Sequence, residues 1–483
     1  MSRIRRDRQS GQSLVSVIGL TSVVALLVIA SLTWARSTTS QGARDVREDR
    51  ALQAAEAGLQ QYISRMVENP GYVSQYVDKA EDPRTATASG QVVGPGNAWP
   101  SGQTQWTYSG PPTTWMPLDD QRFGQASYSL RVNNENGLVV QSTARVMPSG
   151  GKNPVERSVQ ATIAPISISD FQMIANTSIA YGSAATTEGK LWSAGDISHA
   201  GTAKERLYAA NYVCRSGGLP CSNSQATNSA FTKGAFDKAT TPSFNDAAPQ
   251  IDFTAFTQDM VNIKNAAQAT GVYRNDGTAK AWMVQFLSSG SVRIWKITGN
   301  PNLETSVGTL QCPQTITMPG GAQPFYMYFE QPVVVGNGNS VTDSCSATSG
   351  SRASVVDGQV TLVSASNVYI GNDIDYETSG DDVLGLIAGG EMIMANYTPT
   401  NLNWRAATLA QNGQWRTAAG YSGNHGQLVF RGSTATSNGG YANMFNSRSY
   451  LYDTTLKSLR PPLFPTLEGD WDVSKWREVT PPS

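Results

Sequence analysis

The chain has 483 residues and a nearly balanced charge, with 36 lysines and arginines against 37 aspartates and glutamates. This length is enough for two or three domains. No long basic patch follows the first few residues, so the sequence does not indicate strong nonspecific binding to nucleic acid, and no nucleic-acid partner is expected. Serine, threonine, asparagine and glycine are plentiful and charge is sparse, which is typical of extracellular β-rich proteins with many turns.

The first 35 residues combine a short basic leader with a long uncharged run. Four arginines precede Gly11, and no residue from Gln12 to Ala35 is ionisable. As an α-helix these 24 residues would reach roughly 36 Å, enough to cross a bilayer core. We therefore expect a transmembrane helix over residues 12–35, with the basic flank in the cytoplasm and the C-terminal bulk outside. Its apolar residues include Leu14, Val15, Leu20, Leu26, Leu27 and Leu32.

Three interpretations of this segment are open. A secretory signal peptide would have a shorter apolar region followed by a small-residue cleavage site. A plain membrane anchor fits the length alone. A prepilin leader, residues 1–11, would be cut between Gly11 and Gln12 and would leave the apolar segment on the mature protein.

Residues 43–68 continue the helix with an amphipathic pattern. Gly58 is its one weak helix former, and Asn69-Pro70-Gly71 ends it because proline cannot donate a backbone hydrogen bond. One helix over residues 12–68 is predicted, and its second half needs a partner domain or subunit. The residues that share one face by their i, i+3, i+4, i+7 spacing are Leu52, Ala55, Glu56, Leu59, Tyr62, Ile63 and Met66.

Two short stretches of this region carry a family resemblance: Ser10–Val15 at the cleavage point, and Leu52–Leu59, which reads LQAAEAGL. Together they resemble PilX-type minor pilins and the related K-type pseudopilins of type II secretion. The resemblance covers residues 1–70 and implies processing by a prepilin peptidase and assembly with other pilin subunits and the pilus assembly machinery. Ser16 stands where major pilins carry a glutamate, which indicates a minor subunit.

Residues 125–164 predict a meander of antiparallel strands. Ser127–Val132 alternates, and Leu138–Met147 and Val155–Ile163 follow as two further strands separated by turns. Packed on the amphipathic half of the helix, the meander would bury the face that contains Leu52 and Leu59. Residues 69–165 are therefore expected to form a pilin-like α+β head.

From residue 166 to residue 483, short apolar stretches recur between turns rich in glycine, asparagine, aspartate and serine. Such ladders indicate either a β-sandwich or the stacked turns of a β-helix. We favour β-helix-like stacking, because the strands are short and the turns are not two-residue hairpins. A helix over 252–269 and a hairpin over 282–297 predict an insertion at about 250–298. The expected fold is mainly β with a long N-terminal α-helix.

The four cysteines are Cys214, Cys221, Cys312 and Cys345. An even number outside the cytoplasm suggests two disulfides, most simply 214–221 and 312–345, although the sequence leaves three pairings open. Zinc is not expected, because the spacing is not Cys-x-x-Cys and neither histidine lies beside a cysteine.

One acidic cluster is a candidate calcium site. Asp373, Asp375 and Glu377 alternate, so on a strand all three side chains would point to one side. Calcium could neutralise them with oxygen ligands, although the spacing is not a full EF-hand loop. The alternative is a solvated acidic face. No other cofactor or metal is expected.

Two features suggest carbohydrate chemistry. Asp381-Asp382 and His425 on a β-helix resemble pectin-degrading hydrolases, and inverting glycoside hydrolysis needs two carboxylates. Asn424 interrupts the Gly-His-Gly pattern of that family, and no Arg-x-Lys follows, so no enzymatic activity is expected. The aromatic residues of the last 90 positions, including Trp404 and Trp415, are expected in a core rather than on a sugar-binding surface.

The sequence as a whole predicts a minor pilin-like structural subunit of a type IV pilus or related filament, with a large exposed head for adhesion or assembly priming. The expected location is the cell membrane with a single pass, and the cell surface or pilus after assembly. Two alternatives are open: a type II secretion pseudopilin, and a membrane-anchored polysaccharide-binding β-helix protein.

Overall fold

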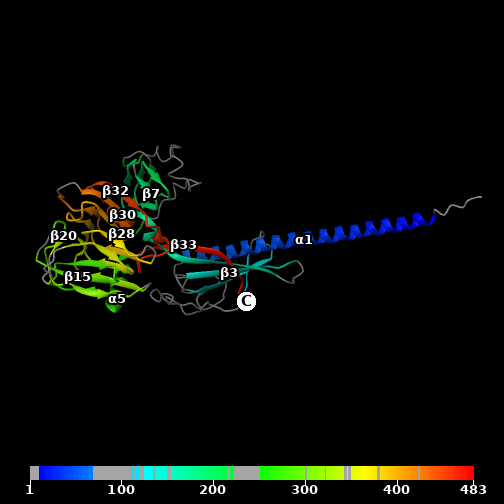
Figure 1. The fold of residues 1–483 in the computed structure, drawn as a ribbon, viewed down its shortest axis with the longest axis horizontal. Helices are drawn as coiled ribbons and strands as arrows, with labels where there is room; N and C mark the ends of the chain where they lie inside the picture. The colour runs from blue at the N-terminus through cyan, green and yellow to red at the C-terminus, as the bar shows by residue number, and fades with distance from the viewer. Residues whose placement is uncertain are drawn as a thin grey trace, which may run out of the picture. The chain divides into compact units, whose positions relative to one another are not determined.

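The computed structural model divides into two compact units, Met1–Pro165 with Glu468–Ser483 (unit 1), and Ile166–Leu467 (unit 2) (Figure 1). The described residues are mainly β, which confirms the predicted class at that level. Side chains of α1 and β33 are described only in part. The structure describes residues 10–68, 111–112, 115–118, 125–133, 138–148, 154–183, 185–205, 207–214, 218–221, 251–299, 302–320, 323–341, 345, 350–377, 381–421 and 425–482.

Unit 1 contains helix α1 (Ser10–Glu68) and a five-stranded sheet in the order β1-β2-β3-β4-β33. Strands β2, β3 and β4 are antiparallel neighbours, with Val140 opposite both Val132 and Ala161. The period-2 alternation of the sequence therefore predicted these three strands correctly. The bounds are β1 Met116–Pro117, β2 Ala126–Asn133, β3 Leu138–Val146, β4 Val155–Ser167 and β33 Thr466–Val479.

Strand β33 changes the predicted domain boundary. The sequence placed all of residues 166–483 in one domain, whereas β33 lies beside β4 and completes the sheet of unit 1. Main-chain hydrogen bonding to a strand that is distant in sequence assigns these residues to unit 1. Unit 2 is therefore an insertion between β4 and β33. Residues 69–110, the first part of the predicted pilin-like head, lie outside the described residues.

The predicted membrane segment requires a correction. A helix needs about 20 consecutive apolar residues to span a bilayer. Within the part of the chain that the structure describes, no helix has the length and apolarity for a crossing. The exposed side chains described in this part of α1 are those of residues 26–31 and Trp34, a much shorter stretch. This finding contradicts the predicted location, which was a single pass through the cell membrane with the C-terminal bulk outside.

Unit 2 contains two large sheets among its described residues. The 12-stranded sheet follows the order β11-β8-β5-β30-β28-β26-β23-β18-β13, with β22, β25 and β32 attached beside this path. Its bounds are β5 Phe171–Ala175, β8 Lys190–Ser193, β11 Leu207–Ala209, β13 Val272–Arg274, β18 Pro324–Phe329, β22 Ser354–Val356, β23 Gln359–Ser364, β25 Ile374–Tyr376, β26 Val383–Ala388, β28 Leu402–Ala410, β30 His425–Thr436 and β32 Phe445–Leu451.

The second large sheet has nine strands in the order β16-β15-β14-β19-β24-β27-β29-β31, with β17 attached to β15. Its bounds are β14 Ala281–Leu287, β15 Ser291–Thr298, β16 Thr309–Leu310, β17 Gln314–Thr317, β19 Val333–Val335, β24 Val368–Ile370, β27 Met392–Met394, β29 Trp415–Thr417 and β31 Gly440–Tyr441. Three smaller sheets are also present among the described residues. One has the order β12-β9-β6, with bounds β6 Ile179–Tyr181, β9 Ile197–His199 and β12 Val213–Cys214. The other two pair β7 (Thr186–Thr187) with β10 (Thr202–Ala203) and β20 (Asn337–Val341) with β21 (Gly350–Arg352).

Successive turns of the chain stack in parallel. β18 pairs with β23 and β23 with β26 in one sheet, while β19 pairs with β24 and β24 with β27 in the other. Each turn thus contributes one strand to each sheet, as in a β-helix, and this is the alternative that the short strands favoured. The positions aligned at one corner of the stack are Phe329, Ser364, Ala388, Ala410, Thr436, Ala175, Ser193 and Ala209.

The order of the stack differs from the order of the sequence. β30 is followed by β5, so Thr434–Thr436 pair with Met173–Ala175. The turns from β5 to β12 extend a stack that begins at β13. The segment predicted as an insertion at 250–298 opens this stack, because β13 pairs in parallel with β18 and β14 with β19. Only β15, β16 and β17 are antiparallel additions to the two large sheets as the structure describes them.

Alternate residues of each strand enter different cores. Leu362 and Ile370, from facing sheets, share the inner core with Trp404 and Trp415, as expected for these tryptophans. Val363 faces the other way, toward α5 (Phe256–Thr270) and Phe464. Helix α5 begins after a turn in which Asp252 Oδ1 accepts the backbone N–H of Thr254, and its N-terminus has no side-chain cap. Two short 3-10 helices, η2 (Ile168–Asp170) and η3 (Thr454–Lys457), complete the unit.

Candidate functional site

The packed face of α1 is built mainly from alanine. Ala51, Ala54, Ala55, Leu59 and Tyr62 are all at most 1% exposed. They share a core with β2 and β3 side chains, including those of Tyr128, Leu130, Val140 and Ala144. Short alanine side chains let the helix axis approach the sheet closely. The amphipathic helix face that the sequence predicted therefore packs against strands β2 and β3.

The predicted helix face is rotated by about one position relative to the observed face. Ala55 and Leu59 lie in the core, whereas Leu52 and Ile63 are only partly buried at its edges. Glu56 is half-buried. The prediction weighted large apolar residues, but Ala51 and Ala54 lie nearer the sheet.

Gly58 is the residue that sequence reasoning missed. A Cβ atom at this position would lie 2.5 Å from Tyr128 Cδ2 and 2.7 Å from Ser142 Oγ. Real Cβ contacts essentially never fall below 3.0 Å, so only glycine fits here without movement of the Tyr128 and Ser142 side chains. The sequence did contain a signal, namely a glycine inside an otherwise strong helical pattern. Such a glycine lowers helix stability, so its presence indicates another reason, such as close packing.

Polar contacts surround this interface. The Tyr128 hydroxyl donates to Gln61 Oε1 at 2.5 Å. Arg157 of β4 lies 2.7 Å from a carboxylate oxygen of Glu478 on β33 and 3.7 Å from one of Glu48 on α1. These side chains are roughly one third exposed, so the ion pairs contribute little to the stability of the fold.

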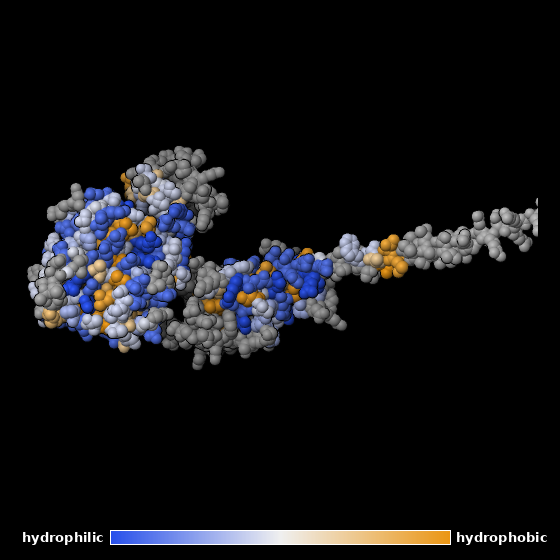
Figure 2. Space-filling view, viewed as in Figure 1, coloured by the Kyte–Doolittle hydropathy of each residue, from blue (hydrophilic) through white to orange (hydrophobic). Residues whose placement is uncertain are grey.

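The N-terminal part of α1 presents exposed apolar side chains. Leu26, Leu27, Val28, Ile29 and Trp34 are between 49% and 73% exposed (Figure 2). An exposed apolar surface of this kind indicates a partner surface. The other predicted residues of this segment, Gly11, Gln12, Leu14, Val15, Leu20 and Leu32, lie within the bounds of α1, but their side chains are outside the described residues.

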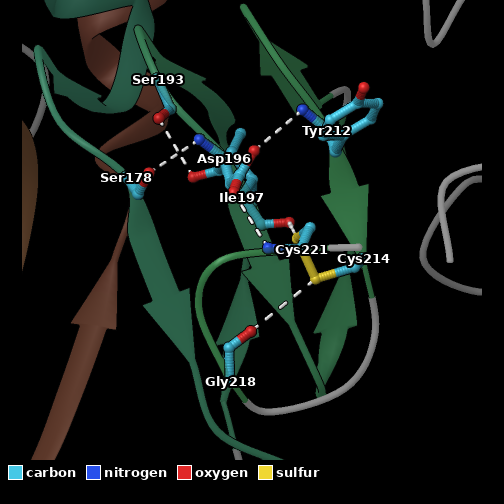
Figure 3. The surroundings of a disulfide bond; sticks show 8 residues. All are labelled: Ser178, Ser193, Asp196, Ile197, Tyr212, Cys214, Gly218 and Cys221. Carbon is cyan, nitrogen blue, oxygen red and sulfur yellow. Dashed lines mark hydrogen bonds between the residues drawn. A yellow bond between two sulfur atoms is a disulfide. The ribbon is translucent and has the colours of Figure 1, made fainter. Parts of the chain in front are cut away.

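Both disulfides are present, in the simplest of the three pairings. Cys214 bonds Cys221 with a Cα–Cα distance of 5.6 Å, and Cys312 bonds Cys345 with a Cα–Cα distance of 5.2 Å. The first closes a short loop beside Asp196 (Figure 3). The second joins the chain after β16 to the chain after β20.

The calcium hypothesis is wrong for the residues that the structure describes. Asp375 and Glu377 are exposed, as the alternation predicted, but no three His, Cys, Asp or Glu side chains of the described part could hold a metal ion. Backbone N–H groups occupy the carboxylates instead: Asp373 Oδ1 accepts from Asn403, and Asp375 Oδ1 from Tyr376. Burial and the nearby charge of Asp375 raise the pKa of Asp373.

The residues that suggested glycoside hydrolysis have structural partners. Asp382 is buried, and its Oδ1 accepts the backbone N–H of Gly358 at 2.7 Å. Asp381 is exposed in the turn that precedes β26. The His425 ring lies edge-on to Phe445 with centroids 5.3 Å apart. These contacts connect neighbouring turns of the stack.

Comparisons with known proteins give limited information. No family model matches the chain, and no curated protein matches it. Among solved structures, the chain is similar to the competence-associated pilin ComZ from Thermus thermophilus, with 14% sequence identity and a TM-score of 0.28. That alignment covers 90% of this chain and 97% of the other. A TM-score this low supports no conclusion about the role of this chain.

Proposed function

We propose that the chain is a minor pilin-like structural subunit of a type IV pilus or related filament, and that it catalyses no reaction. The leading support is the combination of the Ser10–Val15 and Leu52–Leu59 patterns with the two surfaces of α1. The C-terminal part of the helix is packed on its own sheet, while the apolar part at Leu26–Ile29 has exposed side chains that another subunit can contact.

In this proposal the two units have different roles. Unit 1 joins the subunit to the filament through α1, and unit 2 is the exposed head that adheres or primes assembly. The stacked sheets of unit 2 support this division, because their cores are closed by residues of the same unit and need no partner for stability. A prepilin peptidase would cut the chain between Gly11 and Gln12.

Processing is tested by N-terminal sequencing of the mature protein. A mature N-terminus at Gln12 supports the proposal, and a Gly11→Leu variant should stay unprocessed. An intact Met1 or Ser2, or a cut after Ala35, contradicts the prepilin interpretation.

Incorporation is tested separately with sheared filaments and an antibody against unit 2. Leu27→Asp should abolish incorporation, since a buried unpaired carboxylate in a subunit contact is strongly unfavourable. Val261→Asp is the matched control, because Val261 is also apolar and exposed (41%) but lies on α5 of unit 2. Equal incorporation of both variants would contradict the role of α1. Absence from filaments combined with a secretion defect in a deletion strain would indicate the pseudopilin alternative.

A further inference from the structure

The stack of unit 2 is built from two separate stretches of the chain. We call residues 171–214, which contain β5 to β12, the small array, and residues 272–451, which contain β13 to β32, the large array. The arrays meet where β5 pairs with β30, and β7 (green) lies beside β32 (orange) there (Figure 1). The chain does not run from β32 into β5, and neither disulfide links the arrays, so noncovalent contacts hold this junction together.

Within each array, hydrogen-bonded ladders join successive turns on several faces. In the large array β28 pairs with β30, β29 with β31, and β30 with β32. In the small array β5 pairs with β8, β6 with β9, and β7 with β10. At the junction the described strands form one ladder, in which Thr434–Thr436 lie opposite Met173–Ala175. β31 and β6 each end their own sheet there, and β7 pairs with β10 but, among the described strands, not with β32.

The apolar cores are divided at the same place. Trp404 lies in the inner core of the large array, whereas Ile179 and Leu191 of the small array belong to a separate inner cluster. One outer core does continue across the junction, because Ile174 of β5 shares a cluster with Leu409 of β28. As the structure describes it, the junction is therefore tied by one ladder and one shared outer core, while the inner core is interrupted.

Gln172 is a buried side chain that spans the junction. It is 3% exposed, and its Oε1 accepts the backbone N–H groups of Glu188 and Gly189, both at 2.8 Å, within the small array. Its Nε2 donates to the carbonyl oxygen of Tyr450 in the large array at 3.0 Å. The backbone N–H of Asn176 also crosses the junction and donates to a carbonyl oxygen of β30 at 3.0 Å. These two hydrogen bonds exist only while the arrays are docked.

In a stacked repeat structure, stability is approximately the sum of the repeats and of the interfaces between neighbours, so the stack parts first at its weakest interface. We propose that the β5–β30 junction is that interface, and that the small array leaves the large array there as one unit while the large array stays folded. A freed stretch of this length buries too little surface to stay folded alone, so its backbone amides lose protection together. The inference concerns unit 2 by itself and does not depend on a role in filaments.

The test is amide hydrogen exchange of the full chain in increasing urea, below the concentration that unfolds the protein. The amides of Ala194 and Ala210 donate within the small array, and those of Gly389 and Gln411 donate within the large array. Asn176, Ala194 and Ala210 should converge on one protection factor, at least about tenfold lower than that of the other two amides, because each hydrogen bond of a missing ladder is worth about fivefold.

Two results of this experiment would overturn the proposal. A common protection factor for all five amides would mean that unit 2 opens as one body. Stronger protection of Asn176 than of Ala210 would mean that the small array loses its protection without leaving β30.

The variant Gln172→Glu weakens the junction selectively. It keeps an oxygen for the two N–H groups inside the small array, but it replaces the donor to Tyr450 with a carboxylate that faces a carbonyl oxygen. The protection of Asn176 and Ala194 should fall by about tenfold to a hundredfold, while that of Gly389 stays unchanged. A variant that fails to dock at all should still protect Gly389, and loss of protection there would refute separate opening.

The matched control is Gln411→Glu. Gln411 is 4% exposed, and its Nε2 also donates to a backbone carbonyl oxygen, that of Phe253 at 3.2 Å, which lies outside the small array. This variant places the same buried carboxylate away from the junction, so the protection of Asn176 should equal that of the wild type. An unchanged Asn176 in Gln172→Glu, or an equal loss of its protection in both variants, would refute the junction as the weakest interface.

Discussion

The substitution Gly58→Ala distinguishes between two opposite expectations. Helix propensity alone predicts that alanine stabilises α1 by about 1 kcal/mol relative to glycine. The structure predicts the reverse, because the new Cβ would lie 2.5 Å from a ring atom of Tyr128, which is itself almost fully buried. Overpacking a well-filled core costs about 1–3 kcal/mol. We therefore expect a net loss of up to about 2 kcal/mol in the stability of unit 1.

The assay is amide hydrogen exchange of β3, which reports the local stability of unit 1 without requiring two-state unfolding of the whole chain. The matched control is Gly42→Ala, since Gly42 lies on the same helix and a Cβ there would meet no atom within 4 Å. Gly42→Ala should leave β3 protection unchanged or raise it, and Gly58→Ala should lower it by up to about thirtyfold. Equal or greater protection in Gly58→Ala would refute the close-approach explanation.

Three further predictions concern unit 2. Burial lowers the pKa of His199 in the folded protein. As the pH falls, the unfolded chain is therefore protonated at a higher pH than the folded protein, and stability should fall as the pH drops below about 6.5. His199→Phe should flatten this part of the profile of melting temperature against pH, relative to wild type. Arg405→Met leaves buried Asp453 without its two guanidinium hydrogen bonds (2.6 and 3.0 Å) and should cost about 3–5 kcal/mol in urea unfolding, and an unchanged midpoint would contradict this. Phe464→Ala should cost about 3–5 kcal/mol and make residues 452–467 sensitive to protease, whereas Leu463→Ala, at an exposed position, should not.

Local periodicity accounts for the elements that the sequence predicted well. Strands β2 to β4 have a period of two and pair with their sequence neighbours, so both their existence and their order follow from the chain. The helix face was found from its spacing, but its centre was displaced, because spacing does not reveal that Ala54 is fully buried or that Gly58 lies in close contact with Tyr128.

Pairing between distant segments explains what was missed. The junction of β30 with β5 joins Thr434 to Met173, and no local pattern encodes a contact across so much chain. The residues of β33 were assigned to the domain that begins at residue 166, although Thr466–Val479 pairs within the sheet of unit 1. The carboxylates of Asp373 and Asp375 were placed on the correct face, but the backbone N–H groups that occupy their oxygens could not be inferred from composition.

The position of β33 has a consequence for how the protein is made. A ribosome completes β4 before it begins unit 2, and it supplies β33 only after the whole of unit 2 has been synthesised. Until then one edge of β4 lacks its neighbour and can pair with any passing strand. A chain that stops short of Thr466 therefore keeps an open sheet edge at β4, and such an edge is a site for pairing with other chains.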